Sequence, residues 1–357
     1  MNIAIVGGGN VGTQFAVHCA EKGHAVTIFT SKPQEFSSEL SIVNERGEVL
    51  RRGAVCATDD ENIFAKAELI FVTTPSFMAE RVAEQIVPKL HAGTLIGLIP
   101  GTGGMECVFR GALARGCVLF GLQRVPSVAR LKEYGRTVCA SGYREKLHVA
   151  ALPNKEIERC RRLVEELLSM RCEALPGYLN VTLTPSNPIL HTTRLKTLFA
   201  DYRTGKKYSQ IPLFYEEWSD ESSKCLFACD GEVQNLCRLL GEFDLTAVRS
   251  LKEHYESATP EALTQKIRSI ASFRGIQTPY VEVEGGYIPD FNSRYFTADF
   301  PYGLAILQQI AAFAGAESSA MEEVYGWYEA IVGPHRKFRF SDYAIFSKAE
   351  FIKFYSQ

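Results

Sequence analysis

Several features are missing from this sequence of 357 residues, and each absence excludes a class of protein. It has no long run of lysine or arginine, and its formal net charge is −2. Binders of nucleic acid or anionic membranes carry basic patches, so we expect neither partner. No apolar run reaches the length of a membrane span, and the first residues, MNIAIVGGGNVG, lack the features of a secretory signal. We therefore expect a cytoplasmic protein that acts on small molecules.

Paired cysteines are also absent. The ten cysteines form no Cys-x-x-Cys pair, and no histidine is spaced to complete a zinc site with Cys225, Cys229 and Cys237. We expect no metal, and we expect reduced thiols packed in cores. Hydrophobic residues make up 46% and charged residues 22% of the chain, a composition typical of globular proteins that need no metal or disulfide for stability.

The first half of the sequence alternates apolar runs with amphipathic segments. Residues 2–6 (NIAIV) and 25–29 (AVTIF) predict strands, and helical periodicity lies between them. The alternation continues to about residue 155 and predicts a parallel sheet with right-handed crossovers. At this length two domains are expected.

Most segments of the second half have helical periodicity instead. Helices are predicted at 188–199, 231–240, 244–255, 260–270, 301–314 and 317–331. The predicted fold is therefore an α/β Rossmann-type dinucleotide-binding domain over residues 1–178, followed by an all-helical domain over residues 179–357.

A glycine-rich turn follows the first predicted strand. Gly7, Gly9 and Gly12 fit the pattern G-x-G-x-x-G, with Asn10 and Val11 inside it. Because the turn joins a strand to a helix within a βαβ unit, it has the context of a dinucleotide-binding fingerprint. The N-terminus of the helix would offer its N–H groups to the phosphates. A glycine turn without a ligand is the alternative interpretation.

The end of the second predicted strand indicates the kind of dinucleotide. NAD(H)-binding folds carry an acidic residue there, whereas this sequence has Thr30, Ser31 and Lys32. Two hydroxyls and an ammonium suit a 2′-phosphate, so we expect NADP(H), with NAD(H) or a merely solvated turn as alternatives. Thr74 and Pro75 follow the next strand and are expected to flank the dinucleotide.

A histidine lies at the start of a helix in TPSNPILHTTRL, residues 184–195. Asn187 is suited to the N-cap and Pro188 to the first helical position, which puts His191 at the fourth. One interpretation is a packed histidine bonded to a backbone carbonyl. The other is a catalytic histidine, because it follows the predicted boundary, where the second domain faces the cofactor cleft.

A later stretch, residues 292–315, combines aromatic residues with an arginine and an aspartate. Pro301 and Gly315 bracket a predicted helix, and Asp299 lies close to its N-cap. Asp299 is therefore either a cap or a catalytic group, and Arg294 is either a surface cation or a substrate ligand.

Together these segments resemble the opine dehydrogenases, the family of the octopine and nopaline dehydrogenases. The resemblance rests on the order and spacing of the glycine turn and of two motifs, Asn187-Pro188-x-x-His191 and Arg294-Tyr295-x-x-x-Asp299-x-Pro301-x-Gly303. It spans most of the chain. It implies that His191 and Asp299 form the catalytic pair, that Arg294 engages a substrate carboxylate, and that Asn187 lies at the substrate.

The reaction implied is the reductive condensation of an α-keto acid with the amino group of an amino acid. His191 would act as general acid and base, Asp299 would fix its tautomer, and Arg294 would hold a carboxylate bidentately. One departure concerns residues 123–130 (QRVPSVAR), where relatives often carry an acidic residue and a Leu-Pro-Tyr element. Arg124 and Arg130 in this stretch could bind a further anionic group or lie at the surface.

Two other functions remain open. A ketopantoate-reductase-like or 3-hydroxyacid dehydrogenase would reduce a ketone without an amine; such enzymes usually rely on a lysine, and Lys196 lies on a different face of the helix from His191. A non-catalytic dinucleotide-binding protein is the second alternative. Residues 214–223 and 295–302 are candidate lid or amine-pocket segments. A homodimer is compatible with the sequence but not required by it.

Overall fold

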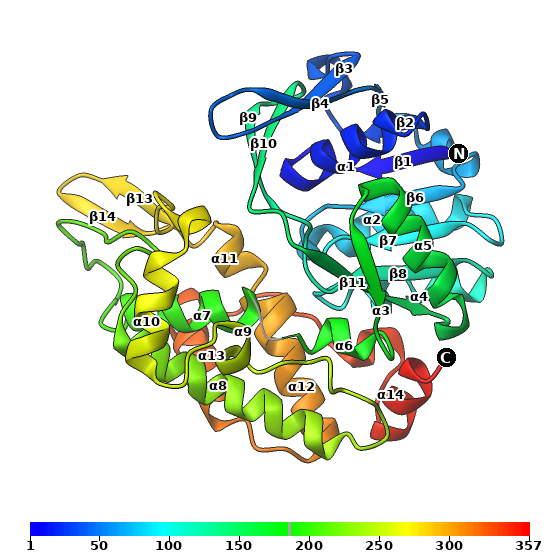
Figure 1. Cartoon of the computed structure of the whole chain (residues 1–357). Helices are drawn as coiled ribbons and strands as arrows, with labels where there is room; N and C mark the ends of the chain where they lie inside the picture. Colours follow the sequence, from blue (N-terminus) through cyan, green and yellow to red (C-terminus); the bar gives the residue numbers. More distant parts are fainter. Residues whose placement is uncertain (185–186) are drawn as a thin grey trace. The chain divides into compact units, whose positions relative to one another are not determined.

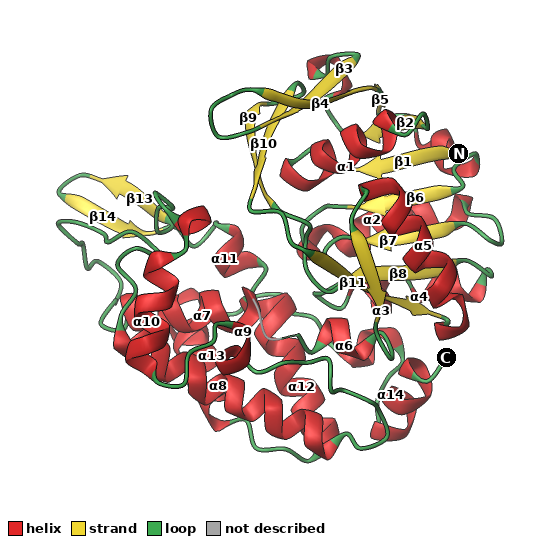
Figure 2. Cartoon of the chain, in the orientation of Figure 1, coloured by secondary structure: helices red, strands yellow, loops and turns green. Residues whose placement is uncertain are grey.

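The structure is a computed structural model that describes residues 1–184 and 187–357. It divides into two compact units. Unit 1 comprises Met1–Thr182 and Lys353–Gln357, and unit 2 comprises Leu183–Ile352 (Figure 1). Unit 1 contains both large sheets, and unit 2 is built mainly of helices (Figure 2). The functional boundary at residues 178–179 stays a prediction.

Unit 1 is built on an eight-stranded sheet of order β12-β11-β8-β7-β6-β1-β2-β5. All neighbours pair in parallel except β8 and β11. Every residue of β6 and β7 is buried, as expected for a sheet covered on both faces. The strands are β1 (Asn2–Val6), β2 (Ala25–Phe29), β5 (Cys56–Thr58), β6 (Leu69–Val72), β7 (Leu95–Leu98), β8 (Val118–Leu122), β11 (Lys146–Leu152) and β12 (Arg171–Ala174).

A second, four-stranded sheet of order β4-β3-β10-β9 also belongs to unit 1. Its strands are β3 (Glu39–Val43), β4 (Val49–Ala54), β9 (Val128–Glu133) and β10 (Thr137–Ser141). Helix α1 (Asn10–Glu21) packs against strands of both sheets. The apolar run at residues 137–141 of the sequence indicates β10, whereas charged residues such as Arg51, Arg52 and Lys132 interrupt the apolar pattern of β4 and β9.

The other helices of unit 1 are short apart from α5. They are α2 (Ala79–Ile86), α3 (Met105–Val108), α4 (Arg110–Ala114), α5 (Ile157–Leu168) and α6 (Leu179–Thr182).

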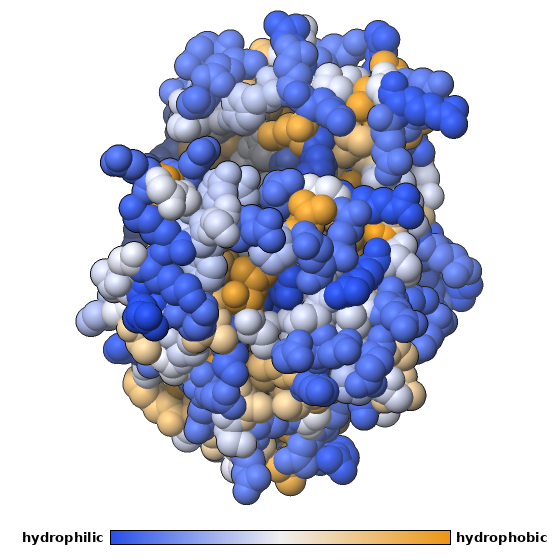
Figure 3. All heavy atoms as spheres, turned by 90° about the vertical axis from the view of Figure 1, so that its left-hand side faces the viewer, coloured by the Kyte–Doolittle hydropathy of each residue, from blue (hydrophilic) through white to orange (hydrophobic). Residues whose placement is uncertain are grey.

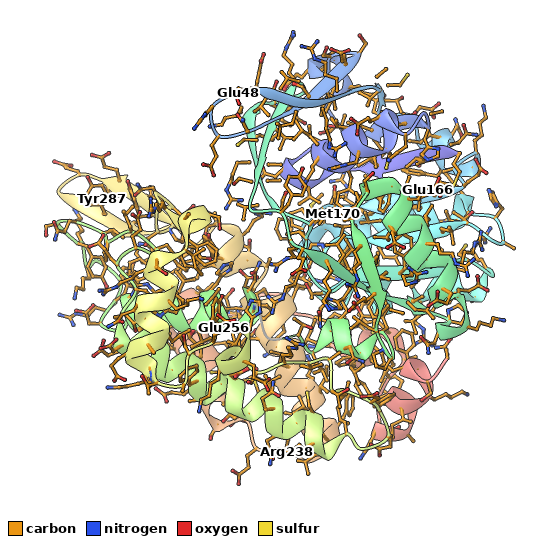
Figure 4. The ribbon with its side chains drawn as sticks, viewed as in Figure 1. Glu48, Glu166, Met170, Arg238, Glu256 and Tyr287 are labelled. Atoms are coloured by element: carbon orange, nitrogen blue, oxygen red, sulfur yellow. The ribbon has the colours of Figure 1, made fainter. Side chains whose placement is uncertain are left out.

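Unit 2 is helical, as predicted, but not entirely so. Its helices are α7 (Asn187–Leu198), α8 (Asp220–Leu239), α9 (Leu251–His254), α10 (Pro260–Ser269), α11 (Arg294–Thr297), α12 (Ala305–Ala314), α13 (Ser319–Val332) and most of α14 (Lys348–Tyr355). A hairpin of β13 (Tyr280–Val283) and β14 (Gly286–Pro289), which carries Tyr287 (Figure 4), corrects the all-helical expectation.

Two helix predictions in unit 2 were also wrong in extent. The helix expected at 231–240 is the second half of α8, which begins at Asp220 because Ser219 caps it by accepting a hydrogen bond from the Ser222 amide. Within 244–255 only α9 is helical, and its start is fixed by a capping box between Ser250 and Glu253.

No helix of the described residues is long and apolar enough to cross a membrane. Hydrophilic residues cover most of the face shown in Figure 3, and apolar residues lie there in small separate groups. All ten cysteines are free thiols. The expectation of buried thiols fails for Cys56, which is exposed, and for Cys225 and Cys237, which are half-buried.

A buried carboxyl group joins three separate segments of unit 1. Glu106 is fully buried in α3, and its Oε1 accepts hydrogen bonds of 2.6 Å from the hydroxyls of Thr182 and Tyr355. Its Oε2 has no hydrogen-bond partner among the described residues. Burial raises the pKa of Glu106 because desolvation disfavours the carboxylate. The C-terminal residues are therefore held to the sheet domain through a carboxyl group that folding favours in its protonated form.

The raised pKa predicts how stability depends on pH. The folded chain binds the Glu106 proton more tightly than the unfolded chain does. The protonated carboxyl group therefore contributes its full stabilisation to the fold at pH values below its ordinary pKa, and this contribution is lost as pH rises through the raised pKa of the folded state. Glu106→Gln keeps an oxygen for both hydroxyls but cannot ionise. Its melting temperature, followed by circular dichroism, should rise relative to that of the wild type between about pH 5 and pH 8. A constant difference over this range would contradict the prediction.

Candidate active site

The glycine turn of unit 1 has the geometry of a phosphate-binding loop. Gly7 has φ +99°, a left-handed conformation that favours glycine, and a Cβ on Gly12 would lie 1.8 Å from the Gly7 carbonyl oxygen. A Cβ on Gly9 would meet nothing within 4 Å. Gly7 and Gly12 therefore close the turn, while Gly9 leaves open space at the N-terminus of α1. The first N–H groups of that helix have no partner within it, as an anion site requires.

The loop after β6 completes the edge of this site. Strands β1 and β6 are parallel neighbours, whereas the chain runs from β1 to β2 on the other side, so a crevice is expected at their carboxyl ends. Thr73 supports the turn by donating from its hydroxyl to the carbonyl of Val6 at 2.9 Å. The Oγ1 of Thr74 is buried without a partner among the described residues. Thr74 of the predicted pair thus lies beside Gly7 of the glycine turn, and Pro75 follows it in the chain.

The segment predicted to bind the 2′-phosphate lies under the turn between β9 and β10. Thr30 Oγ1 lies 3.4 Å from the Tyr134 hydroxyl and accepts from the Lys32 amide. Ser31 is exposed, and the Lys32 ammonium forms an exposed 3.0 Å ion pair with Glu35. The segment predicted to bind the ribose 2′ position therefore carries both the ammonium of Lys32 and the carboxylate of Glu35. An ammonium suits the 2′-phosphate of NADP(H), and a carboxylate suits the 2′-hydroxyl of NAD(H).

Two further predicted cofactor residues, Asn10 and Val11, lie with Gly12 in the first turn of α1. Asn10 accepts a 2.8 Å hydrogen bond from the Leu131 amide through its side-chain oxygen, which ties α1 to β9. Val11 is half-buried and packs against the core of unit 1. Only the backbone N–H groups of these residues are therefore placed to face a phosphate.

The predicted histidine and aspartate meet within unit 2. His191 Nδ1 lies 2.8 Å from Asp299 Oδ2, although 108 residues separate them in sequence. A carboxylate can only accept, so Nδ1 carries the hydrogen and the tautomer of a neutral His191 is fixed. His191 therefore does not donate to a backbone carbonyl, as one interpretation of the sequence had it, because Asp299 is the partner of Nδ1.

Asp299 is brought to His191 by an irregular turn. It precedes a π-helical turn, Phe300–Leu304, and makes no side-chain cap hydrogen bond. Gly303 in this turn packs against Pro188 of α7, and a Cβ on Gly303 would lie 2.9 Å from Pro188 Cβ. The predicted continuous helix at 301–314 is thus a π-turn followed by α12, and the turn aims Asp299 at α7 instead of capping a helix.

Aromatic side chains surround the His191 ring. Tyr295 meets it edge-on with centroids 4.3 Å apart, and Phe214 stacks on Tyr295 at 4.9 Å. The second ring nitrogen, Nε2, lies 2.8 Å from the Tyr215 hydroxyl. His191 is 6% exposed and Tyr215 is 4% exposed. Both nitrogens of a buried imidazole therefore have defined hydrogen-bond partners.

A buried arginine holds the segment that carries Phe214 and Tyr215. Arg194, one turn after His191 on α7, donates from Nε to the Phe214 carbonyl at 3.0 Å and from Nη2 to the Glu217 carbonyl at 2.7 Å. Its guanidinium lies 5.5 Å from the Trp218 ring. Burial lowers the pKa of Arg194 to about 10. One helix thus presents the histidine and fixes the segment beside it.

The other predicted substrate residues lie near this pair in sequence but are more open. Arg294 begins α11 and is exposed, and its guanidinium has no hydrogen bond or ion pair within residues 1–184 and 187–357. Asn187 is the first residue of α7 and is exposed, so the helix begins one position earlier than predicted. Of the two arginines in the departing stretch, Arg130 is exposed and donates to the Ala129 carbonyl, and Arg124 is half-buried.

Sequence reasoning missed three residues of this site. Tyr215 and Phe214 lay inside the candidate lid segment 214–223, but nothing in the pattern placed them on the His191 ring. Arg194 follows His191 by three positions, the helical spacing that puts two side chains on one face, and that signal could have been used.

Comparison with known proteins adds the family. Residues 174–332 match the model for the NAD/NADP octopine/nopaline dehydrogenase α-helical domain, and residues 3–141 match that for ketopantoate reductase PanE/ApbA. The chain is 24% identical to the octopine dehydrogenase of Pecten maximus, over 93% of this chain and 90% of that protein. It is 24% identical to the tauropine dehydrogenase of Arabella iricolor, over 75% and 72%.

Solved structures share the fold. An octopine dehydrogenase with NADH and L-arginine gives a TM-score of 0.78 at 22% identity, covering 92% of this chain and 88% of that one. A second structure, with NADH and pyruvate, gives the same score at 93% and 89% coverage. An NADP⁺-bound yersinopine dehydrogenase gives 0.63 at 11% identity, covering 92% and 90%.

A Rossmann-type domain with a phosphate-binding turn and a helical dehydrogenase domain define the class: the protein is an NAD(P)-dependent oxidoreductase. More particularly, residues 174–332 are similar to the helical domain of the octopine and nopaline dehydrogenases, and the similarity to octopine dehydrogenase extends over 93% of the chain.

The contrast between Gly9 and Gly12 gives a matched test of the cofactor loop. Gly9→Ala places a methyl group in open space, so its stability should stay within about 1 kcal/mol of wild type while dinucleotide binding weakens at least tenfold. Gly12→Ala overlaps the Gly7 carbonyl and should cost about 1–3 kcal/mol of stability. Thermal unfolding and quenching of protein fluorescence by the dinucleotide measure the two effects. Undiminished binding by a folded Gly9→Ala protein would refute the assignment of the loop.

Proposed function

We propose that this protein is an NADPH-dependent opine dehydrogenase. The reaction joins an α-keto acid, an amino acid, NADPH and a proton to give an N-(carboxyalkyl) amino acid, NADP⁺ and water. The observation that carries the proposal is the hydrogen bond between His191 Nδ1 and Asp299 Oδ2, within the part of the chain that matches the octopine/nopaline dehydrogenase domain.

His191 is proposed as the general acid and base. In its protonated form the imidazole polarises the keto oxygen and donates a proton as the carbinolamine loses water to form the imine. Such assistance contributes about 10²- to 10⁴-fold in rate. Asp299 holds the ring by accepting from Nδ1, so that Nε2 is the nitrogen that exchanges the proton. The bound nicotinamide supplies the hydride.

Arg294 and Asn187 are proposed to bind the substrate. The Arg294 guanidinium is exposed and has no hydrogen bond or ion pair within the described ranges. Its planar fork can grip a carboxylate through two parallel hydrogen bonds. The relatives' structures with pyruvate and with L-arginine support a small keto acid and an amino acid as the substrate pair.

The competing ketone reductase receives less support. The ketopantoate reductase model matches only the first half of the chain, whose dinucleotide fold serves either chemistry. A ketone reductase would need a catalytic lysine. Lys196 instead binds Glu323, because its Nζ lies 2.5 Å from Glu323 Oε1. The non-catalytic alternative leaves the exposed Arg294 and the His191–Asp299 pair without a role.

The decisive assay follows NADPH and NADH absorbance with pooled α-keto acids, with and without pooled amino acids. We expect oxidation only when both pools are present, and subdivision of the pools then identifies the substrates. Oxidation with keto acid alone would move the protein to the ketone reductases. With the identified pair, His191→Ala should lower kcat at least about 10²-fold and leave the Kd for NADPH unchanged, because its ring acts only on the substrate.

The choice between the dinucleotides is tested at Lys32. Lys32→Ala should weaken NADPH binding about tenfold, the value of one charge-assisted hydrogen bond, and leave NADH binding unchanged. Isothermal titration with each dinucleotide measures this. Glu35→Gln is the matched control, because it breaks the same ion pair while retaining the ammonium, and it should not weaken NADPH binding. Equal loss of both dinucleotides in Lys32→Ala would show that Lys32 does not read the 2′-phosphate.

A further inference from the structure

The hydroxyl of Tyr215 occupies the one nitrogen of His191 that Asp299 leaves free. It lies 2.8 Å from Nε2, the atom to which the proposed mechanism assigns proton exchange. When His191 is neutral, Nδ1 donates to Asp299 and Nε2 accepts from the Tyr215 hydroxyl; when it is protonated, Nε2 donates to the same oxygen. The phenol can therefore serve either charge state without moving its ring.

The Tyr215 ring is held in place by two aromatic neighbours. It stacks on Phe273 with centroids 4.1 Å apart and an interplanar angle of 18°, and it lies nearly parallel to Trp218 at 6.2 Å. A tyrosine packed in this way cannot swing its hydroxyl far from His191 without leaving both rings. The hydrogen bond is thus imposed by packing and does not depend on a mobile side chain.

The backbone on either side of Tyr215 is fixed as well. Arg194 donates to the carbonyls of Phe214 and Glu217, and it also donates to the Ser222 hydroxyl at 3.3 Å. A guanidinium that is 3% exposed and bonded to neutral oxygens is costly to desolvate. Its position one turn after His191 means that the same helix sets both the imidazole and the phenol.

We propose that Tyr215 relays the proton between His191 and the substrate. Its hydroxyl, held at Nε2 on the side of the ring opposite Asp299, gives its own proton to the substrate oxygen as it accepts the proton of Nε2, and the reverse transfer restores both groups. The inference rests on the proposed role of His191 and extends it to a residue 24 positions away. The titratable side chains that contact His191 in the described part of the chain are Asp299, Tyr215 and Tyr295.

The test is Tyr215→Phe, which keeps the stacked ring and removes only the hydroxyl. Loss of the hydroxyl that carries the proton should lower kcat about 10²-fold, with the KM of the keto acid unchanged. The pH profile of kcat should move, because the hydrogen-bond partner of Nε2 is gone. A merely structural tyrosine would leave that profile where it is.

A matched control exists elsewhere in unit 2. The Tyr325 hydroxyl lies 2.8 Å from His335 Nε2, so Tyr325→Phe breaks a tyrosine–histidine hydrogen bond of equal length that does not involve His191. This variant should retain wild-type kcat and pH profile. If Tyr215→Phe behaves like Tyr325→Phe, with unchanged kcat and pH profile, the proposal is wrong.

A second readout is independent of activity. In protein labelled with ¹⁵N-histidine, Tyr215→Phe should shift the His191 Nε2 resonance and leave that of His335 in place, and Tyr325→Phe should do the reverse. An unmoved His191 signal would overturn the inference. Because this measurement needs no substrate, it separates failure of the Tyr215 proposal from failure of the proposed condensation, which would appear only in the assay.

Discussion

The hydrogen bond between His191 and Asp299 is the constraint behind the irregular turn that follows Asp299 in unit 2. It joins α7 to a segment 108 residues later, and a regular helix at Asp299 would have directed the carboxylate to its own N–H groups. The π-turn at Phe300–Leu304 avoids this, and the close approach of Gly303 to Pro188 presses that turn against α7. Irregular helix geometry of this kind is common at functional sites because it re-aims a side chain.

Helix α7 also carries a buried arginine, Arg194, whose desolvation costs free energy. Arg194 is buried, and its guanidinium donates to two backbone carbonyls and a hydroxyl, so an apolar residue of similar size would avoid the cost of desolvation. What the guanidinium provides is geometry, because its fork reaches two carbonyls of the segment that carries Tyr215. A buried cation that fixes a loop beside the proposed catalytic pair fits the general observation that functional sites retain costly groups.

The elements that could be predicted from the sequence are those with local signals. The strands β1 and β2, the glycine turn and the start of α7 follow from apolar runs and from Gly, Asn and Pro at positions with steric requirements. Strands β4 and β9 of the four-stranded sheet were missed because they carry exposed charged residues. Tyr215 was missed because no local pattern encodes a contact between residues that only tertiary packing brings together.

The two halves of the chain contribute differently to the proposed reaction. The dinucleotide half matches a model shared with ketone reductases, so its glycine turn and its Thr30–Lys32 segment can determine which cofactor binds but not what is reduced. The helical half contains the only pair among the proposed site residues that can exchange a proton, and it contains the exposed Arg294 beside Tyr295 of the aromatic cluster. Differences in substrate between this chain and its relatives should therefore arise from α7, α11 and the 214–223 segment, where the residues around His191 are packed tightly enough for one side chain to change the site.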